Sequence, residues 1–182
     1  MKKAKYLIAA AALAASPAVH AIDGVSVVYG HSDSSNVNVN MGRVGVQWDW
    51  NKRWLEMGNW HFGGYWESDF GYWANSSHNR THANIIDAGI TPVFRLQQTT
   101  RSAIAPYAEL GVGLHFLSAT SLNDQRRFGS SFQFGDHVGA GVRFGEKGQY
   151  DLGYRYQHFS NAGIKEPNQG VNYHELRVQY HF

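Results

Sequence analysis

Apolar residues alternate with polar or small residues along most of this chain. From Ile104 to Phe116 the even positions are apolar, whereas the odd positions are mostly polar or small. The same division recurs from Phe132 to Phe144 and from Leu176 to Phe182. A period of two predicts β-strands that have one apolar face and one polar face.

Eight segments of the chain follow this pattern. They span residues 22–30, 37–50, 53–74, 82–97, 103–116, 131–145, 149–160 and 171–182. Several are longer than the roughly five or six residues of a typical strand, and tilted strands that cross a membrane need about 9–11. The large aromatic residues lie on the apolar face, and the other face is too small and charged for an ordinary core. We therefore predict an all-β fold, an eight-stranded antiparallel transmembrane β-barrel of the bacterial outer membrane.

The connections between these segments support the barrel. Those at 51–52 and 146–148 are short, whereas those at 31–36, 75–81, 117–130 and 161–170 are longer. Short periplasmic turns that alternate with longer extracellular loops are typical of outer-membrane barrels. The alternative is a soluble barrel or sandwich that buries the apolar faces in a core.

The N-terminus has the pattern of an export signal. Residues 1–5 are positively charged, residues 6–15 are mostly apolar, and small residues lead to Ala21. We expect residues 1–21 to be a signal peptide and residues 22–182 to form one barrel domain.

The composition excludes several other classes of function. The chain has no cysteine, and its net charge of +2 comes without a basic run, so we expect no disulfide and no nucleic-acid partner. None of the ten histidines has metalloprotease spacing, and we expect neither a metal nor a cofactor. We interpret His78, His82, His115 and His137 as polar groups of the loops or the lumen. The tryptophans and tyrosines are interpreted as an interfacial girdle, not as a platform for a sugar.

His158 and Ser160 continue the apolar, outward phase of the seventh segment. They lie two residues apart, about 7 Å between Cα atoms, so their side chains can meet along the strand. If the N-terminus is periplasmic, this end of the strand is extracellular. A His-x-Ser pair is a weak signal by itself, and polar residues at a strand end are the alternative explanation.

Three segments resemble the PagL-type lipid A 3-O-deacylase family. Residues 158–168 (HFSNAGIKEPN) resemble its active-site block, and residues 130–137 and 108–113 resemble other parts of it. The resemblance implies an eight-stranded outer-membrane barrel that hydrolyses the ester at the 3-position of lipid A. It also implies serine-hydrolase chemistry without a metal.

The resemblance assigns a role to four residues. By this resemblance Ser160 matches the nucleophile and His158 the general base. A serine hydroxyl attacks poorly until a base takes its proton, so the two residues have to act together. Gly163 and Asn168 match the donors to the oxyanion, which must be fixed in advance.

The third member of the catalytic group departs from the family pattern. Asn172 stands where the family has an acidic residue, and an amide can orient an imidazole but cannot stabilise its charge. If residues 146–148 form a three-residue turn, Asp136 lies opposite His158. We hypothesise that Asp136 supplies or supports the missing charge; a solvated carboxylate at the rim is the alternative.

The expected function is therefore lipid A deacylation in the outer membrane. The expected partner is lipopolysaccharide, whose phosphates Arg126 and Arg127 could bind. The sequence leaves open whether the protein forms a homodimer. One alternative is a non-catalytic small barrel in adhesion or membrane stability, which would carry long adhesive loops. Another is a soluble periplasmic lipid-binding barrel.

Overall fold

The computed structural model describes residues 21–80, 84–99 and 104–182. Apart from Ala21, the predicted signal peptide lies outside the described residues, and so does His82. Within these ranges the structure contains no helix with the length and apolarity that a membrane-spanning helix requires.

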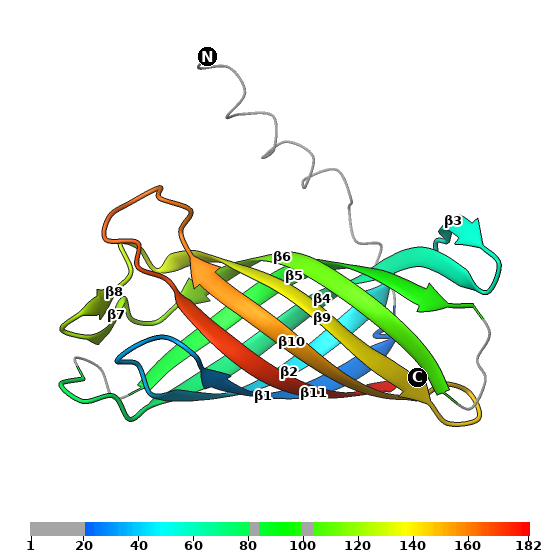
Figure 1. Ribbon diagram of the computed structural model, residues 1–182, viewed down its shortest axis with the longest axis horizontal. Coiled ribbons are helices and arrows are strands. Elements are labelled where there is room, and N and C mark those ends of the chain that lie inside the picture. Colours follow the sequence, from blue (N-terminus) through cyan, green and yellow to red (C-terminus); the bar gives the residue numbers. More distant parts are fainter. Residues whose placement is uncertain (1–20, 81–83, 100–103) are drawn as a thin grey trace, which may run out of the picture.

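Eight long antiparallel strands form a closed barrel, as the alternation predicted (Figure 1). They are β1 (Gly24–Ser32), β2 (Val39–Asp49), β4 (Trp60–Asn75), β5 (Asn84–Gln98), β6 (Ile104–Leu117), β9 (Phe132–Phe144), β10 (Tyr150–Ser160) and β11 (Val171–His181). Each strand pairs with its neighbours in sequence, and pairing between β1 and β11 closes the circle. We call the end that carries the connections after β1, β4, β6 and β10 the loop end, and the opposite end the turn end.

The predicted strand over residues 53–74 is wrong, because the chain reverses within it. The structure has a short strand β3 (Trp54–Met57), a turn at Gly58 and Asn59, and then β4. β3 pairs only with β4, beyond the rim of the barrel at the turn end (Figure 1). The two-residue turn sets Met57 opposite Trp60, and a register shift within β3 then sets Trp54 opposite Phe62. The even positions thus share a face again on both sides of the reversal, and the alternation does not reveal it.

The lumen is filled by charged side chains that form ion pairs. Its buried ionic residues are Arg43, Glu67, Asp69, Asp87, Arg95, Glu109, Asp151, Arg155, Glu175 and Arg177, with His115 and His137 among them as predicted. Arg155 lies between two carboxylates: its Nη1 is 2.7 Å from Glu67 Oε1 and its Nε is 2.7 Å from Glu109 Oε1. An eight-stranded barrel has room inside only for side chains. These side chains join opposite walls of the barrel.

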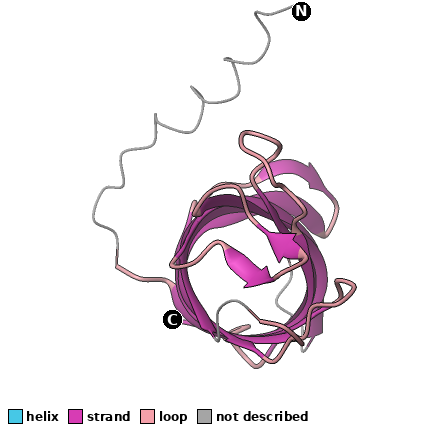
Figure 2. Cartoon of the chain, turned by 90° about the vertical axis from the view of Figure 1, so that its left-hand side faces the viewer, coloured by secondary structure: helices cyan, strands magenta, loops and turns pink. Residues whose placement is uncertain are grey.

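An apolar cluster fills the lumen at the loop end. It consists of Val37, Val39, Met41, Trp73, Ile85, Leu117, Leu122, Phe128, Phe159, Val171 and Tyr173. A short hairpin, β7 (Ser121–Asn123) and β8 (Arg126–Arg127), lies across this opening (Figure 2). Asn75 holds it by donating a hydrogen bond from Nδ2 to Leu122 O, 2.7 Å away. The lumen is therefore covered at the loop end.

Large apolar side chains cover the outer face of the barrel. Exposed examples include Val25, Val27, Val44, Phe70, Ile90, Leu110, Val112, Leu114, Val138, Leu152, Leu176 and Val178. Contact of such a large apolar surface with water would be unfavourable for a soluble protein. The surface matches the apolar band of a transmembrane barrel.

A charge on this outer face distinguishes a membrane barrel from a soluble one. Val44 lies in the middle of β2, between Val27 and Phe70, and is 57% exposed. We expect Val44→Arg to lower the free energy of unfolding by about 2–4 kcal/mol, the cost of a cation near the bilayer midplane. Denaturant titration of the barrel in lipid vesicles measures it, with Val44→Leu as the control. A Val44→Arg variant as stable as the parent would show that this face meets water.

Candidate active site

His158 lies between Asn172 and Asp136 on the outer face at the loop end. Residues of even number on β10 point outward, and both His158 and Ser160 are half-buried. Pairing of β10 with β11 places Asn172 opposite His158, and pairing of β10 with β9 places Asp136 opposite its other side. Both positions agree with the registers expected from the sequence.

Asn172 holds the imidazole of His158 in one orientation. Its Oδ1 lies 2.5 Å from Nδ1 of His158. If Nδ1 carries the proton and donates it to this amide oxygen, the lone pair of Nε2 is available as a base. An amide thus fills the orienting position that an acidic residue occupies in the family pattern.

Ser160 is the last residue of β10, where it pairs with Phe134. Among the hydrogen bonds of residues 21–80, 84–99 and 104–182, none joins Ser160 to His158. Because both side chains lie on the same face of β10, rotation about side-chain bonds can bring the hydroxyl of Ser160 to the imidazole of His158. Catalytic hydrogen bonds in free enzymes are often long and tighten when the substrate binds.

Asp136 contributes a carboxylate to the same surface. One of its oxygens, Oδ1, is buried and has no hydrogen-bond partner among the described residues. The facing side chains of paired strands are about 5 Å apart at Cβ. Asp136 is therefore close enough to His158 to stabilise a positive charge that develops on the imidazole.

A tight turn follows Ser160 and carries Gly163. The amide of Ile164 donates a hydrogen bond to Asn161 O at 3.0 Å, and Ala162 and Gly163 between them have φ angles of 53° and 73°. Two positive φ angles in a row define a type I′ turn, in which glycine is favoured. Gly163 is exposed, and apart from its two chain neighbours none of the described residues has an atom within 4 Å of the place where a Cβ would stand. Gly163 is thus accessible from outside.

Asn168 ties the far side of the loop to the residue after Ser160. Its Oδ1 accepts a hydrogen bond from the amide of Asn161, 2.9 Å away. The buried Asn161 in turn donates from Nδ2 to Lys165 O at 2.7 Å. With Oδ1 occupied, the Nδ2 hydrogens of Asn168 are the groups that can bind an anion.

Arg126 supports the loop, a role that the sequence did not indicate. Its Nη1 donates to Gln169 O at 3.0 Å and to Gly170 O at 2.6 Å. The backbone amide of its neighbour Arg127 donates to Gln169 Oε1 at 2.8 Å. The guanidinium of Arg126 is thus directed at loop carbonyls, which leaves it fewer donors for the phosphate role suggested above.

Gly170 and Phe159 are two further residues that sequence reasoning missed. A Cβ on Gly170 would lie 2.7 Å from Cε1 of His158, so only glycine lets the loop pass this close to the imidazole. Phe159 lies between His158 and Ser160 in sequence and points into the lumen. Its ring packs 5.0 Å from those of Trp73 and His115. The end of β10 that carries His158 and Ser160 is thus fixed from both sides.

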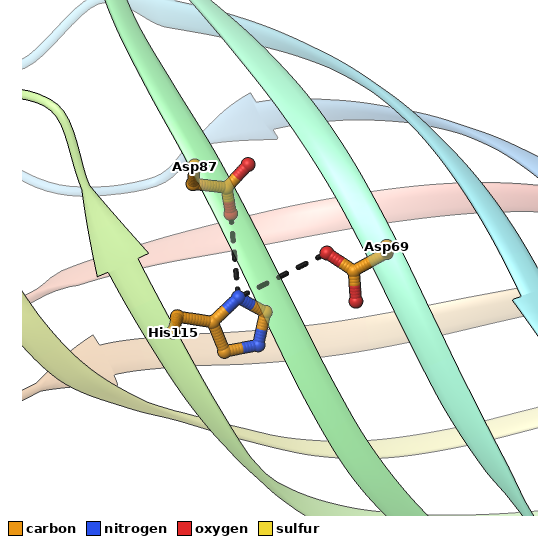
Figure 3. Close-up of side chains that lie close together, drawn as sticks. All are labelled: Asp69, Asp87 and His115. Atoms are coloured by element: carbon orange, nitrogen blue, oxygen red, sulfur yellow. Dashed lines mark ion pairs between the residues drawn. The ribbon is translucent and has the colours of Figure 1, made fainter.

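Asp69, Asp87 and His115 form a group in the lumen that could hold a metal ion (Figure 3). Nδ1 of His115 lies 3.4 Å from Asp87 Oδ2 and 3.9 Å from Asp69 Oδ1. Arg43 reaches the same two oxygens, each at 3.1 Å, and already supplies a counter-charge. The group belongs to the lumen network, on the opposite face of the wall from Ser160.

The bracing role of Arg126 can be tested by proteolysis. We expect Arg126→Gln to free the loop and make trypsin cleave after the exposed Lys165 several times faster, since two hydrogen bonds to the loop are lost. Arg127→Gln is the matched control, because Arg127 holds the loop through its backbone amide. Equal cleavage rates in the two variants would contradict this role.

Comparison with known proteins agrees with the fold and with the family resemblance. The model of the lipid A 3-O-deacylase (PagL) family matches residues 40–181. The lipid A deacylase PagL of Pseudomonas aeruginosa is 34% identical over 176 residues, covering 94% of this chain and 96% of that protein. Its namesake from Bordetella bronchiseptica is 36% identical over 167 residues, covering 87% and 83%.

Solved structures give the same result. The crystal structure of the outer membrane enzyme PagL matches with a TM-score of 0.75 and 30% identity, over 87% of this chain and 99% of that chain. Neisserial surface protein A matches with a TM-score of 0.50 at 15% identity, over 87% and 95%, which indicates a shared fold alone. By sequence along nearly its whole length and by the structure of its barrel, the chain belongs to the lipid A 3-O-deacylase (PagL) family.

Proposed function

We propose that this outer-membrane barrel is a carboxylic ester hydrolase that removes the 3-hydroxyacyl chain from the 3-position of lipid A, with Ser160 as nucleophile and His158 as general base. The observation that carries the proposal is the oriented imidazole. The hydrogen bond between Nδ1 of His158 and Oδ1 of Asn172 leaves Nε2 available to Ser160. Both His158 and Ser160 lie on the outer face, beside the loop of residues 161–170.

The reaction follows from these positions. Nε2 of His158 takes the proton of Ser160 as Oγ bonds to the ester carbonyl carbon, and the carbonyl π electrons move to its oxygen. The amide of Gly163 and Nδ2 of Asn168 donate to this oxyanion. When it collapses, the bond to the sugar oxygen breaks and His158 returns the proton to that oxygen. Water then attacks the acyl-enzyme in the same way and releases the 3-hydroxy acid and free Ser160.

The outer face suits a substrate that stays in the membrane. Ser160 is at the loop end, where the polar head of an amphiphile meets its chains. Along the strands towards the turn end the wall is apolar, with Leu152, Leu176 and Val178 exposed, and it can lie against an acyl chain. Every residue of the proposed mechanism comes from one chain, so the reaction does not require the homodimer considered above.

The nucleophile is tested by a single substitution. We expect Ser160→Ala to abolish the release of 3-hydroxy acid from lipopolysaccharide, because no other hydroxyl replaces Oγ. Mass spectrometry of lipid A after incubation with purified protein measures the loss of one acyl chain. Ser118→Ala, on the connection after β6, is the control and should keep full activity. Product formation by the Ser160→Ala protein would refute the assignment.

The role of Asp136 is tested by moving the charge. We expect Asp136→Asn to lower kcat about tenfold, because imidazolium loses a nearby carboxylate worth about 1.4 kcal/mol. Adding Asn172→Asp should restore most of the rate, since it returns a carboxylate to the other neighbour of His158. Unchanged activity of Asp136→Asn would show that the carboxylate is only solvated at the rim.

A non-catalytic barrel in adhesion or membrane stability is the competing function. It gives no reason for the hydrogen bond between His158 and Asn172 or for the braced loop after Ser160. The assay of acyl release separates the two functions directly.

A further inference from the structure

A polar and aromatic cluster lies on the outer face next to the proposed active site. It consists of Asp33, Tyr154, Tyr156 and His174, and we call it the side cluster. Asp33 follows β1, and its backbone amide donates to Asn172 O at 2.9 Å. The side cluster is thus attached to the residue that orients His158.

The four side chains form one connected network. His174 Nε2 lies 3.3 Å from Asp33 Oδ2, and His174 Nδ1 lies 2.5 Å from the hydroxyl of Tyr154. Tyr156 donates from its hydroxyl to the same Asp33 oxygen at 3.5 Å. The side chains of His174 and Asp33 are 49% and 51% exposed, so a ligand can reach them.

The side cluster lies on the polar side of the rim, where His31 and Tyr29 also contact Asn40 on the neighbouring strand. On β5 and β6 the outward residues near the loop end are apolar, including Ile86, Ile90, Leu114 and Phe116. Within the side cluster the carboxylate of Asp33 and the imidazole of His174 pair with each other, and about half of each side chain stays exposed. Interfacial tyrosines need no such partners. The contacts of Asp33 within the network use Oδ2, which leaves Oδ1 for a further hydrogen bond, so this exposed network is suited to a polar ligand.

Position and chemistry identify the class of ligand. Neighbouring strands are about 5 Å apart and each residue rises about 3.3 Å along a strand. Asp33, level with Asn172, and His174, opposite Tyr156, therefore lie about 12–14 Å from Ser160 between Cα atoms, roughly the span of two sugar rings. An exposed carboxylate accepts sugar hydroxyl groups in strong hydrogen bonds but repels phosphate. The rings of Tyr156 and His174, 5.1 Å apart, offer aromatic faces for the C–H face of a sugar.

We propose that the side cluster is a carbohydrate-binding subsite that holds the amino-sugar backbone of the acylated substrate beside Ser160. Asp33 accepts hydrogen bonds from sugar hydroxyl or amide groups. His174 holds the Asp33 carboxylate in place through Nε2, and the hydroxyl of Tyr154 is a further hydrogen-bonding partner. Tyr156 packs against the ring. This replaces the interpretation of these tyrosines as a girdle, and it rests on the proposed function for the identity of the substrate.

The first experiment measures binding without catalysis. The full-length Ser160→Ala protein in detergent is titrated with a glucosamine disaccharide that lacks all acyl chains, in forms with and without phosphates. We expect both forms to bind and Asp33→Asn or His174→Gln to weaken binding about tenfold, the loss of one charged hydrogen bond. Asp124→Asn, an exposed carboxylate at the same end, is the matched control.

The second experiment compares two esters in the same micelles. For lipid A, we expect Asp33→Asn to raise KM about tenfold. For a p-nitrophenyl ester of a 3-hydroxy acid, which has no sugar, kcat/KM should stay unchanged. Equal losses on both esters would mean that Asp33 only supports the fold, and no loss on either would remove it from recognition.

The two experiments separate the subsite from the proposed reaction. Disaccharide binding that depends on Asp33 supports the subsite even if the wild-type protein does not hydrolyse lipid A. Binding that requires phosphate, or that ignores both variants, overturns the subsite even if lipid A is hydrolysed.

Discussion

The buried ion pairs of the lumen are the constraint on which the rest of the structure depends. Arg155 joins Glu67 to Glu109. Arg177, on β11, also pairs with Glu67, with 2.8 Å between its Nη2 and Glu67 Oε2. Each charge is costly to bury alone, and removing one partner leaves the others unpaired. The lumen is consequently occupied, and any chemistry has to take place on the outer face or at the ends.

This explains why the proposed active site is on the outer face of a strand end. Phe159 points inward and packs among Trp73, Tyr173 and His115, so its neighbours His158 and Ser160 point outward. The apolar cluster at the loop end and the ion pairs below it make the wall rigid. A rigid wall can hold an imidazole at a set distance from a membrane-bound ester, which a flexible loop could not do.

The alternation of residues predicted most of the wall, because a strand exposes its two faces every second residue whatever its neighbours are. It placed His158 and Ser160 outward, and the turn at residues 146–148 gave the register that sets Asp136 opposite His158. It failed at Gly58 and Asn59, where a register shift in β3 offsets the change of phase at the two-residue turn. The hairpin β7–β8 also escaped it, since two or three residues do not show a period.

The sequence by itself determined the barrel, its outward and inward faces, and the family resemblance that names Ser160 and His158. These depend on local alternation and on a contiguous block of residues. Only the tertiary structure decided which distant groups support them: Arg126 on the loop carbonyls, Gly170 against His158, and Asp33 with His174 beside Asn172. Such contacts join residues up to about 140 positions apart, as between Ser34 and Asn172. They exist only once the barrel closes and brings β1 next to β11.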